Sequence, residues 1–178
     1  MDITKISVGP NPPWDVHAII EIPQRSLDPV KYEFDKASGA LFVDRFLNTA
    51  MFYPGNYGFI PHTLAGDGDP IDVLVLAQAA VVPGAVIRVR PIGALMLADE
   101  AGDDEKILAV PVDKLHPFYS GVRSYRNLPT PLLEQIGHFF THYKDLDRGK
   151  FVKTGDWIDA EEAAALIVKA IEAGAAGS

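Results

Sequence analysis

The chain has 178 residues, 48% of them hydrophobic and 22% charged, and its length suits one domain with a substantial core over residues 1–178. It has no cysteine, which excludes disulfides and thiolate-bound metals. A net charge of −8 without any basic tract argues against a nucleic-acid partner.

The N-terminal segment MDITKISVGPNPPWDV (1–16) lacks the apolar region of a secretory signal. The longest apolar stretch, 73–87, is interrupted by Gln78, Pro83 and Gly84 and is therefore unsuited to cross a membrane. We expect a cytoplasmic protein with no membrane partner.

Short runs rich in β-branched and aromatic residues recur through the first two thirds of the chain, with Gly, Pro, Asp or Ser between them. They are HAIIEI (17–22), VKYEF (30–34), ALFVDRF (40–46), IDVLVLA (71–77), AVIRVRPIGALML (85–97) and KILAVPV (106–112). DKASG (35–39) and ADEAGDDE (98–105) have the composition of hairpin turns. The rhythm predicts a small antiparallel barrel or sandwich.

Helical patterns follow Pro129. Thr130 is a candidate N-cap with Pro131 in the first turn, and the apolar residues of 132–143 fall on one helical face. A last helix is expected from near Asp159, where DAEE has capping-box spacing, to near Gly174. We therefore expect an α+β, mainly β fold, with a five-stranded antiparallel OB-like barrel flanked by C-terminal helices.

The segment GDGDPIDVLVL (66–76) crowds three aspartates, Asp67, Asp69 and Asp72, ahead of an apolar run. Two like charges about 4 Å apart repel by about 1 kcal/mol in water and about 4 kcal/mol near a protein surface. If these side chains converge, a cation should lie between them. The segment is not an EF-hand loop, because Asp72 stands where Gly is needed and Gln78 where Glu is needed. In isolation, the segment favours a solvated turn that leads into a strand, with Gly68 and Pro70 as turn residues.

Other polar segments also have ordinary structural explanations. The acids of 99–105 suit a charged hairpin loop, and Lys31 and Glu33 suit the solvated face of a strand. His138 and His142 are four residues apart, but the segment lacks the glutamate of HExxH and a third zinc ligand, so packing or a subunit contact is favoured. The segment 49–63 is too aromatic for an exposed loop, and its buried tyrosine hydroxyls need partners.

Taken together, these segments resemble the soluble, magnesium-dependent inorganic pyrophosphatases of the short prokaryotic type, family I. DGDPIDVLV (67–75) is similar to that family's D-x-D-P-x-D signature followed by an apolar run. The other matching segments are EIP (21–23), KYE (31–33), SGALFVDRF (38–46), FYPGNYGFIPHT (52–63), DEAGDDEK (99–106) and HYKDL (142–146). They occur in order over residues 17–157. The segment from Glu21 to Lys31 is one residue longer than the family's spacing.

The resemblance implies hydrolysis of inorganic diphosphate to two phosphates by a metal-activated water, with Asp69 as general base. The implied metal ligands are Asp67, Asp72, Asp99 and Asp104, with Glu21 and Glu33 close by. The implied diphosphate-binding residues are Lys31, Arg45, Tyr57, Lys106, Tyr143 and Lys144, with Tyr53 alongside. It also implies several Mg²⁺ ions per subunit, with Mn²⁺ or Zn²⁺ as substitutes, and a homo-oligomer, most often a hexamer.

This residue set suits that chemistry. Diphosphate repels a water nucleophile and must release an anion, so catalysis requires charge neutralisation and positioning. Mg²⁺ prefers oxygen ligands, and Arg, Lys and Tyr can hold phosphate oxygens. Two alternatives are an OB-like oligonucleotide-binding module and a calcium-stabilised structural domain. The net charge argues against the first, and the second leaves the Lys, Arg and Tyr set unexplained.

Overall fold

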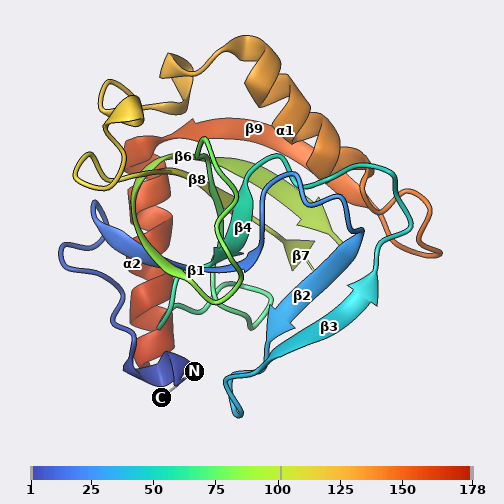
Figure 1. Cartoon of the computed structure of the whole chain (residues 1–178), viewed down its shortest axis with the longest axis horizontal. Coiled ribbons are helices and arrows are strands. Elements are labelled where there is room, and N and C mark those ends of the chain that lie inside the picture. The colour runs from blue at the N-terminus through green and yellow to red at the C-terminus, as the bar shows by residue number, and fades with distance from the viewer. Residues whose placement is uncertain (1, 101, 177–178) are drawn as a thin grey trace.

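The computed structural model describes residues 2–100 and 102–176, and its centre is a ring of five strands (Figure 1). In ring order these are β1 (Val16–Ile22), β4 (Asn56–Phe59), β5 (Asp72–Val75), β8 (Lys106–Pro111) and β6 (Val86–Asp99). β6 pairs back with β1, which completes the ring. The predicted five-stranded barrel is confirmed, and within it one pairing, β5 with β8, is parallel.

The remaining elements surround this ring. β7 (Gly102–Asp103) and β9 (Val152–Asp159) pair with β6, whereas β2 (Val30–Phe34) and β3 (Leu41–Phe46) form a separate two-stranded sheet. Helix α1 (Thr130–His142) packs against β9, and α2 (Ala160–Ala176) packs against β6 (Figure 1). Short 3-10 helices span Ile3–Lys5, Pro117–Tyr119 and Tyr125–Asn127. No helix in the described ranges is long and apolar enough to cross a bilayer.

Neighbouring residues of β5 and β8 point into two different apolar clusters. Val73 and Ile107 pack with residues of α2 in one cluster, whereas Leu74 and Leu108 pack with aromatic residues of α1 in the other. Successive side chains of a strand point to opposite faces, so burial on both faces requires an unbroken apolar run rather than alternation. VLVL (73–76) in β5 and ILAV (107–110) in β8 are such runs, and their packing on both faces positions Asp72 and Lys106, which directly precede them.

The sequence predicts six strands within a few residues of their observed bounds and does not predict β4, β9 or the two-residue β7, which lies in the segment predicted as a turn. β4 lies in the aromatic, Gly- and Pro-containing segment, and β9 contains Gly155 and Asp156, which are poor strand formers.

The predicted cap of α1 was wrong, because Pro129 is the N-cap and Thr130 is already helical. At α2, the Asp159 N–H donates to the Glu162 carboxylate, which is one half of the predicted capping box.

The longer connection between Glu21 and Lys31 is accommodated in the loop before β2. Arg25 has a φ of 54°, in the left-handed region, and its backbone N–H donates to the Tyr53 carbonyl oxygen over 2.9 Å. The loop is thereby tied to the backbone of Tyr53, and Lys31 pairs with Arg45 across β2 and β3.

Strand β4 approaches β1 so closely that Gly58 has no room for a side chain. A Cβ built there would lie 1.9 Å from the Ile19 carbonyl oxygen. Gly58 pairs with Val73 of β5 and with Ile20 of β1, so any shift that relieves this contact would disturb two strand pairings.

We expect Gly58→Ala to lower the free energy of unfolding by roughly 2–3 kcal/mol, because backbone rather than a mobile side chain must move. The measurement is the denaturant midpoint followed by circular dichroism. Gly121→Ala is the matched control, because no atom lies within 4 Å of a Cβ built there. Equal midpoints for the two variants would contradict the tight β1–β4 contact.

Candidate active site

Residues of the ring strands and of the β2–β3 hairpin together line a cavity of about 160 Å³. The parallel pairing of β5 and β8 sets Asp72 directly beside Lys106, each being the first residue of its strand. β6 ends at Asp99, and Asp104 follows two residues before β8. Backbone register therefore gathers acids and a lysine at this cavity.

The cavity brings together nearly all of the site residues predicted from sequence. The predicted residues that line it are Glu21, Lys31, Glu33, Arg45, Tyr57, Asp67, Asp69, Asp72, Asp99, Asp104, Lys106, Tyr143 and Lys144. Tyr53 does not line the cavity. It is buried, with its ring 5.0 Å from that of Tyr57 and 6.4 Å from that of Tyr143. Segments far apart in the sequence thus converge on one cavity.

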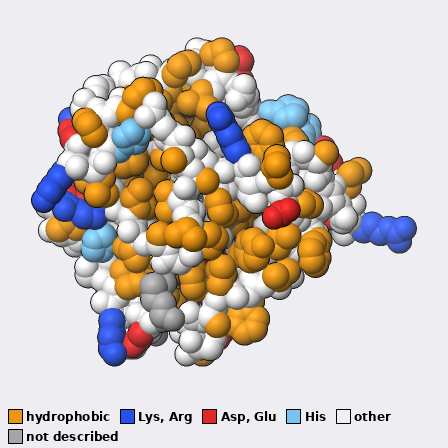
Figure 2. All heavy atoms as spheres, in the orientation of Figure 1, with side chains coloured by type: hydrophobic (Ala, Val, Ile, Leu, Met, Phe, Trp, Pro, Cys, Tyr) orange, Lys and Arg blue, Asp and Glu red, His pale blue; other side chains and the backbone are white. Residues whose placement is uncertain are grey.

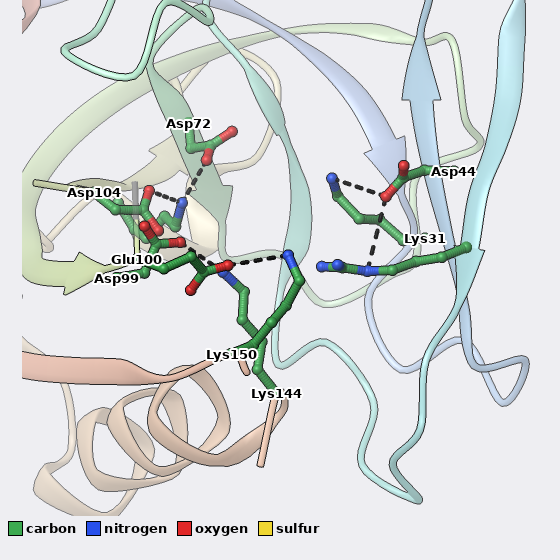
Figure 3. A network of polar contacts seen from close by, with 10 residues as sticks. Lys31, Asp44, Asp72, Asp99, Glu100, Asp104, Lys144 and Lys150 are labelled. Atoms are coloured by element: carbon green, nitrogen blue, oxygen red, sulfur yellow. Dashed lines mark hydrogen bonds and ion pairs between the residues drawn. The ribbon is translucent and has the colours of Figure 1, made fainter. Parts of the chain in front are cut away.

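Ammonium and carboxylate groups alternate on the barrel side of the cavity (Figure 3). The buried Lys106 Nζ donates to Asp72 Oδ2 over 2.5 Å and also contacts Asp104 Oδ1. The buried Lys144 Nζ donates to Asp99 Oδ2 over 2.7 Å. Burial opposes the charge of Lys106, but the Asp72 and Asp104 carboxylates outweigh it and raise the pKa of that lysine. Lys106 is therefore a permanent cation.

The hairpin side of the cavity presents a second cationic group (Figure 3). Lys31 Nζ lies 3.2 Å from Asp44 Oδ2 and 3.6 Å from Glu33 Oε2. The same Asp44 oxygen lies 3.8 Å from Arg45 Nε, a buried atom with no hydrogen-bond partner among the described residues. Asp44 thus attracts both Lys31 and Arg45 electrostatically.

Sequence reasoning missed four charged residues of this region: Lys36, Asp44, Glu100 and Lys150. Lys36 Nζ donates to Asp69 Oδ1 over 2.9 Å, and Lys150 Nζ donates to Glu100 Oε1 over 3.0 Å. The only sequence signal for Asp44 is its place within the matched segment SGALFVDRF. Glu100 likewise lies within the matched segment DEAGDDEK, but Lys36 and Lys150 are 33 and 50 residues from their partners, so no local pattern links them.

Glu21 is a buried carboxyl at the back of the cavity. Its Oε1 accepts a hydrogen bond of 2.8 Å from the Phe34 N–H, which ties β1 to the hairpin. Burial raises the pKa of Glu21 to about 8, and the Phe34 hydrogen bond only partly opposes this. Before any metal binds, Glu21 is therefore largely protonated at neutral pH.

Three tyrosines form the floor between the cavity and α1. Burial raises the pKa of both Tyr53 and Tyr57, so their hydroxyls stay neutral and able to donate. The Lys106 and Lys144 ammonium groups lie 5.8 and 5.5 Å from the ring centroids of Tyr57 and Tyr143 respectively. The rings of Tyr57 and Tyr143 thus lie against the two buried lysines.

The carboxylates of the cavity suit a hard divalent cation by their chemistry, since all of them offer oxygen. Asp67, Asp72, Asp99 and Asp104 line the same cavity. Within residues 2–100 and 102–176, no three Asp, Glu or His side chains are close enough to hold a metal ion as they stand. The Lys106 ammonium lies between two of the four predicted ligands, so these carboxylates already balance positive charge.

The two histidines lie outside this cavity on α1. The rings of His138 and His142 are 4.6 Å apart between centroids, and His142 Nδ1 is 2.7 Å from Asp145 Oδ2. Both side chains are exposed. A subunit-contact role for this pair stays a prediction.

The geometry has close counterparts among known proteins. The family model described as inorganic pyrophosphatase matches residues 18–175. The inorganic pyrophosphatase of Caulobacter vibrioides is 68% identical over 97% of both chains. The crystal structure of an inorganic phosphatase from Anaplasma phagocytophilum is similar with a TM-score of 0.94 at 56% identity, covering 96% of this chain and 99% of that one. The inorganic pyrophosphatase of Thermus thermophilus gives 0.92 at 38% identity, covering 98% and 99%.

We expect Glu21→Gln to gain stability relative to wild type as pH rises from 4.5 to about 8, in metal-free protein. In this window the folded chain keeps a Glu21 proton that the unfolded chain has released, so wild type loses stability with rising pH. Glutamine carries no such proton. Denaturant unfolding at both ends of the window measures the change, with Glu134→Gln on the exposed face of α1 as control. A stability difference that is constant with pH would contradict the buried, protonated carboxyl.

Proposed function

We propose, from the premise that this chain belongs to the inorganic pyrophosphatase family and hydrolyses inorganic diphosphate, that Mg²⁺ is its cofactor and Asp69 its general base. Membership of the family implies a divalent metal cofactor. The observation that carries the proposal is a single cavity in which oxygen ligands for a metal face cations suited to phosphate.

Diphosphate would bind between the two cationic groups of the cavity. Lys31 and Arg45 project from the hairpin, and Lys106 and Lys144 from the opposite side. Arg45 can hold a phosphate through two parallel N–H donors, whereas each lysine supplies a point charge. Tyr57 and Tyr143 would add neutral hydrogen bonds. The two phosphates would therefore be oriented along a line between hairpin and barrel.

Asp67, Asp72, Asp99 and Asp104 would hold the metal. Bound Mg²⁺ supplies charge neutralisation and lowers the pKa of a bound water. Once these carboxylates have a metal partner, the ammonium groups of Lys106 and Lys144 become available to phosphate oxygens. The ion pairs of the ligand-free site thus keep the substrate-binding cations in position beforehand.

Asp69 suits the general base role by its location. It lies between Asp67 and Asp72 in sequence and lines the same cavity, and its N–H donates to Asp67 Oδ1 over 3.0 Å. In the proposed step, the water oxygen attacks one phosphorus and the bridging P–O bond breaks. The water proton passes to Asp69, and the leaving phosphate is stabilised by the lysines and Arg45.

The wider proposal follows the family resemblance. We expect several Mg²⁺ ions per subunit with Mn²⁺ or Zn²⁺ as substitutes, a cytoplasmic location, and a homohexamer. The described chain offers no observation that favours an oligonucleotide-binding module or a calcium-stabilised domain, and both of these would bind ligands without releasing phosphate.

We expect the purified protein to release two phosphates from each diphosphate with Mg²⁺, and to lose this activity when a chelator removes the metal. Replacement by Ca²⁺ should not support comparable turnover. A colorimetric phosphate assay with each ion separates the proposal from both binding-only alternatives. Phosphate release that is unchanged by the chelator would contradict the metal requirement.

We expect Asp69→Asn to lower kcat by about 10²- to 10⁴-fold, because the amide cannot accept the water proton. Affinity for Mg²⁺ and for the non-hydrolysable methylenediphosphonate should stay near wild type, as measured by calorimetry. Asp156→Asn in β9 is the matched control, since this exposed aspartate does not line the cavity. A near-normal kcat in Asp69→Asn would remove that residue from the base role.

A further inference from the structure

We infer that Lys36 is a mobile cation of this site, which holds Asp69 before substrate arrives and then transfers its ammonium group to a phosphate oxygen of diphosphate. The inference rests on the proposed function and adds a substrate-binding and positioning residue to it. The Lys36 Nζ to Asp69 Oδ1 distance is 2.9 Å, and both residues line the cavity.

The hairpin turn fixes the backbone from which Lys36 projects. Asp35 Oδ2 accepts hydrogen bonds from the Ser38 N–H and hydroxyl, at 2.8 and 2.5 Å. The Gly39 N–H donates to the Asp35 carbonyl oxygen over 2.8 Å, and Gly39 has a φ of 65°, which glycine adopts readily. The turn is therefore rigid, and any movement of Lys36 is confined to its flexible side chain.

The backbone of Asp69 is fixed in the same way. Its carbonyl oxygen accepts from the Ala65 N–H over 2.7 Å, and its N–H donates to Asp67. Of the lysines and arginines in the described ranges, Lys36 is the one within ion-pair distance of the Asp69 carboxylate. The other cations of the cavity are paired with Asp44, Asp72, Asp99 or Asp104.

The ion pair is exposed, with side-chain exposures of 54% for Lys36 and 61% for Asp69. Exposed ion pairs are weak, because water and salt compete with them and holding two side chains together costs entropy. Lys36 also lines two hollows that adjoin the cavity, so its side chain has space to reorient. Diphosphate brings several negative charges to this position and can outcompete a single carboxylate for the ammonium group.

The exchange has a direct chemical use. While Lys36 is bound, one Asp69 oxygen is engaged and less accessible to a water molecule. Transfer of the ammonium to phosphate frees that oxygen at the moment when substrate is in place. Lys36 would thereby contribute to diphosphate affinity, whereas proton transfer itself would not need it.

The test compares Lys36→Met, Lys36→Arg and wild type, with Lys169→Met on the exposed face of α2 as matched control. We expect Lys36→Met to raise KM for diphosphate by about three- to tenfold while kcat stays within about twofold. Methylenediphosphonate should bind more weakly by a similar factor in calorimetry. The decline of kcat/KM with added salt should become shallower, because one charge contact is lost. Lys36→Arg should restore most of the affinity.

An active wild type together with unchanged KM and unchanged methylenediphosphonate affinity in Lys36→Met would overturn the inference. A fall in kcat alone would also overturn it, since Lys36 would then act on Asp69 without contacting substrate. A purely structural role would lower the thermal midpoint and leave the salt dependence as in wild type. An inactive wild type would instead contradict the proposed function, so the two failures are distinguishable.

Discussion

The parallel register between β5 and β8 is the constraint on which the cavity depends. It aligns Asp72 with Lys106 and thereby puts a part-buried carboxylate beside a buried ammonium group. An isolated buried charge is very costly, and an alternating array of opposite charges offsets that cost. Under the proposed function, a divalent cation would take the place of the ammonium groups beside the carboxylates, and diphosphate would take the place of the carboxylates beside the ammonium groups.

The packing on both faces of β5 and β8 gives this array its rigidity. α2 covers one face and the aromatic residues of α1 cover the other, so the strands have little freedom to shift when charges rearrange. Tyr53, Tyr57 and Tyr143 link the α1 side to the cavity and stand beneath the two buried lysines. Apolar packing therefore determines where the charged side chains of the cavity lie.

Much of the fold could be predicted from sequence, because apolar runs, turn residues and helical periodicity are local signals. β4 and β9 were not predicted, because pairing with neighbouring strands overrides the low strand propensity of Gly58, Gly155 and Asp156. The site residues were predicted from a family resemblance. Their spacing in the sequence does not by itself predict that they line one cavity. The contact of Lys36 with Asp69 could not be predicted from the resemblance. The two residues are 33 positions apart, and their contact depends on the orientation of the β2–β3 hairpin relative to the ring.

The walls of the cavity come from different parts of the fold: Lys31 and Arg45 belong to the two-stranded sheet, whereas Asp72, Asp99 and Lys106 belong to strands of the ring. Among the described residues the two-stranded sheet shares no strand pairing with the ring, and the loop between β1 and β2 connects them. A change in that loop would therefore move the cations of the hairpin relative to the ring while the strand pairings of the ring stay as they are.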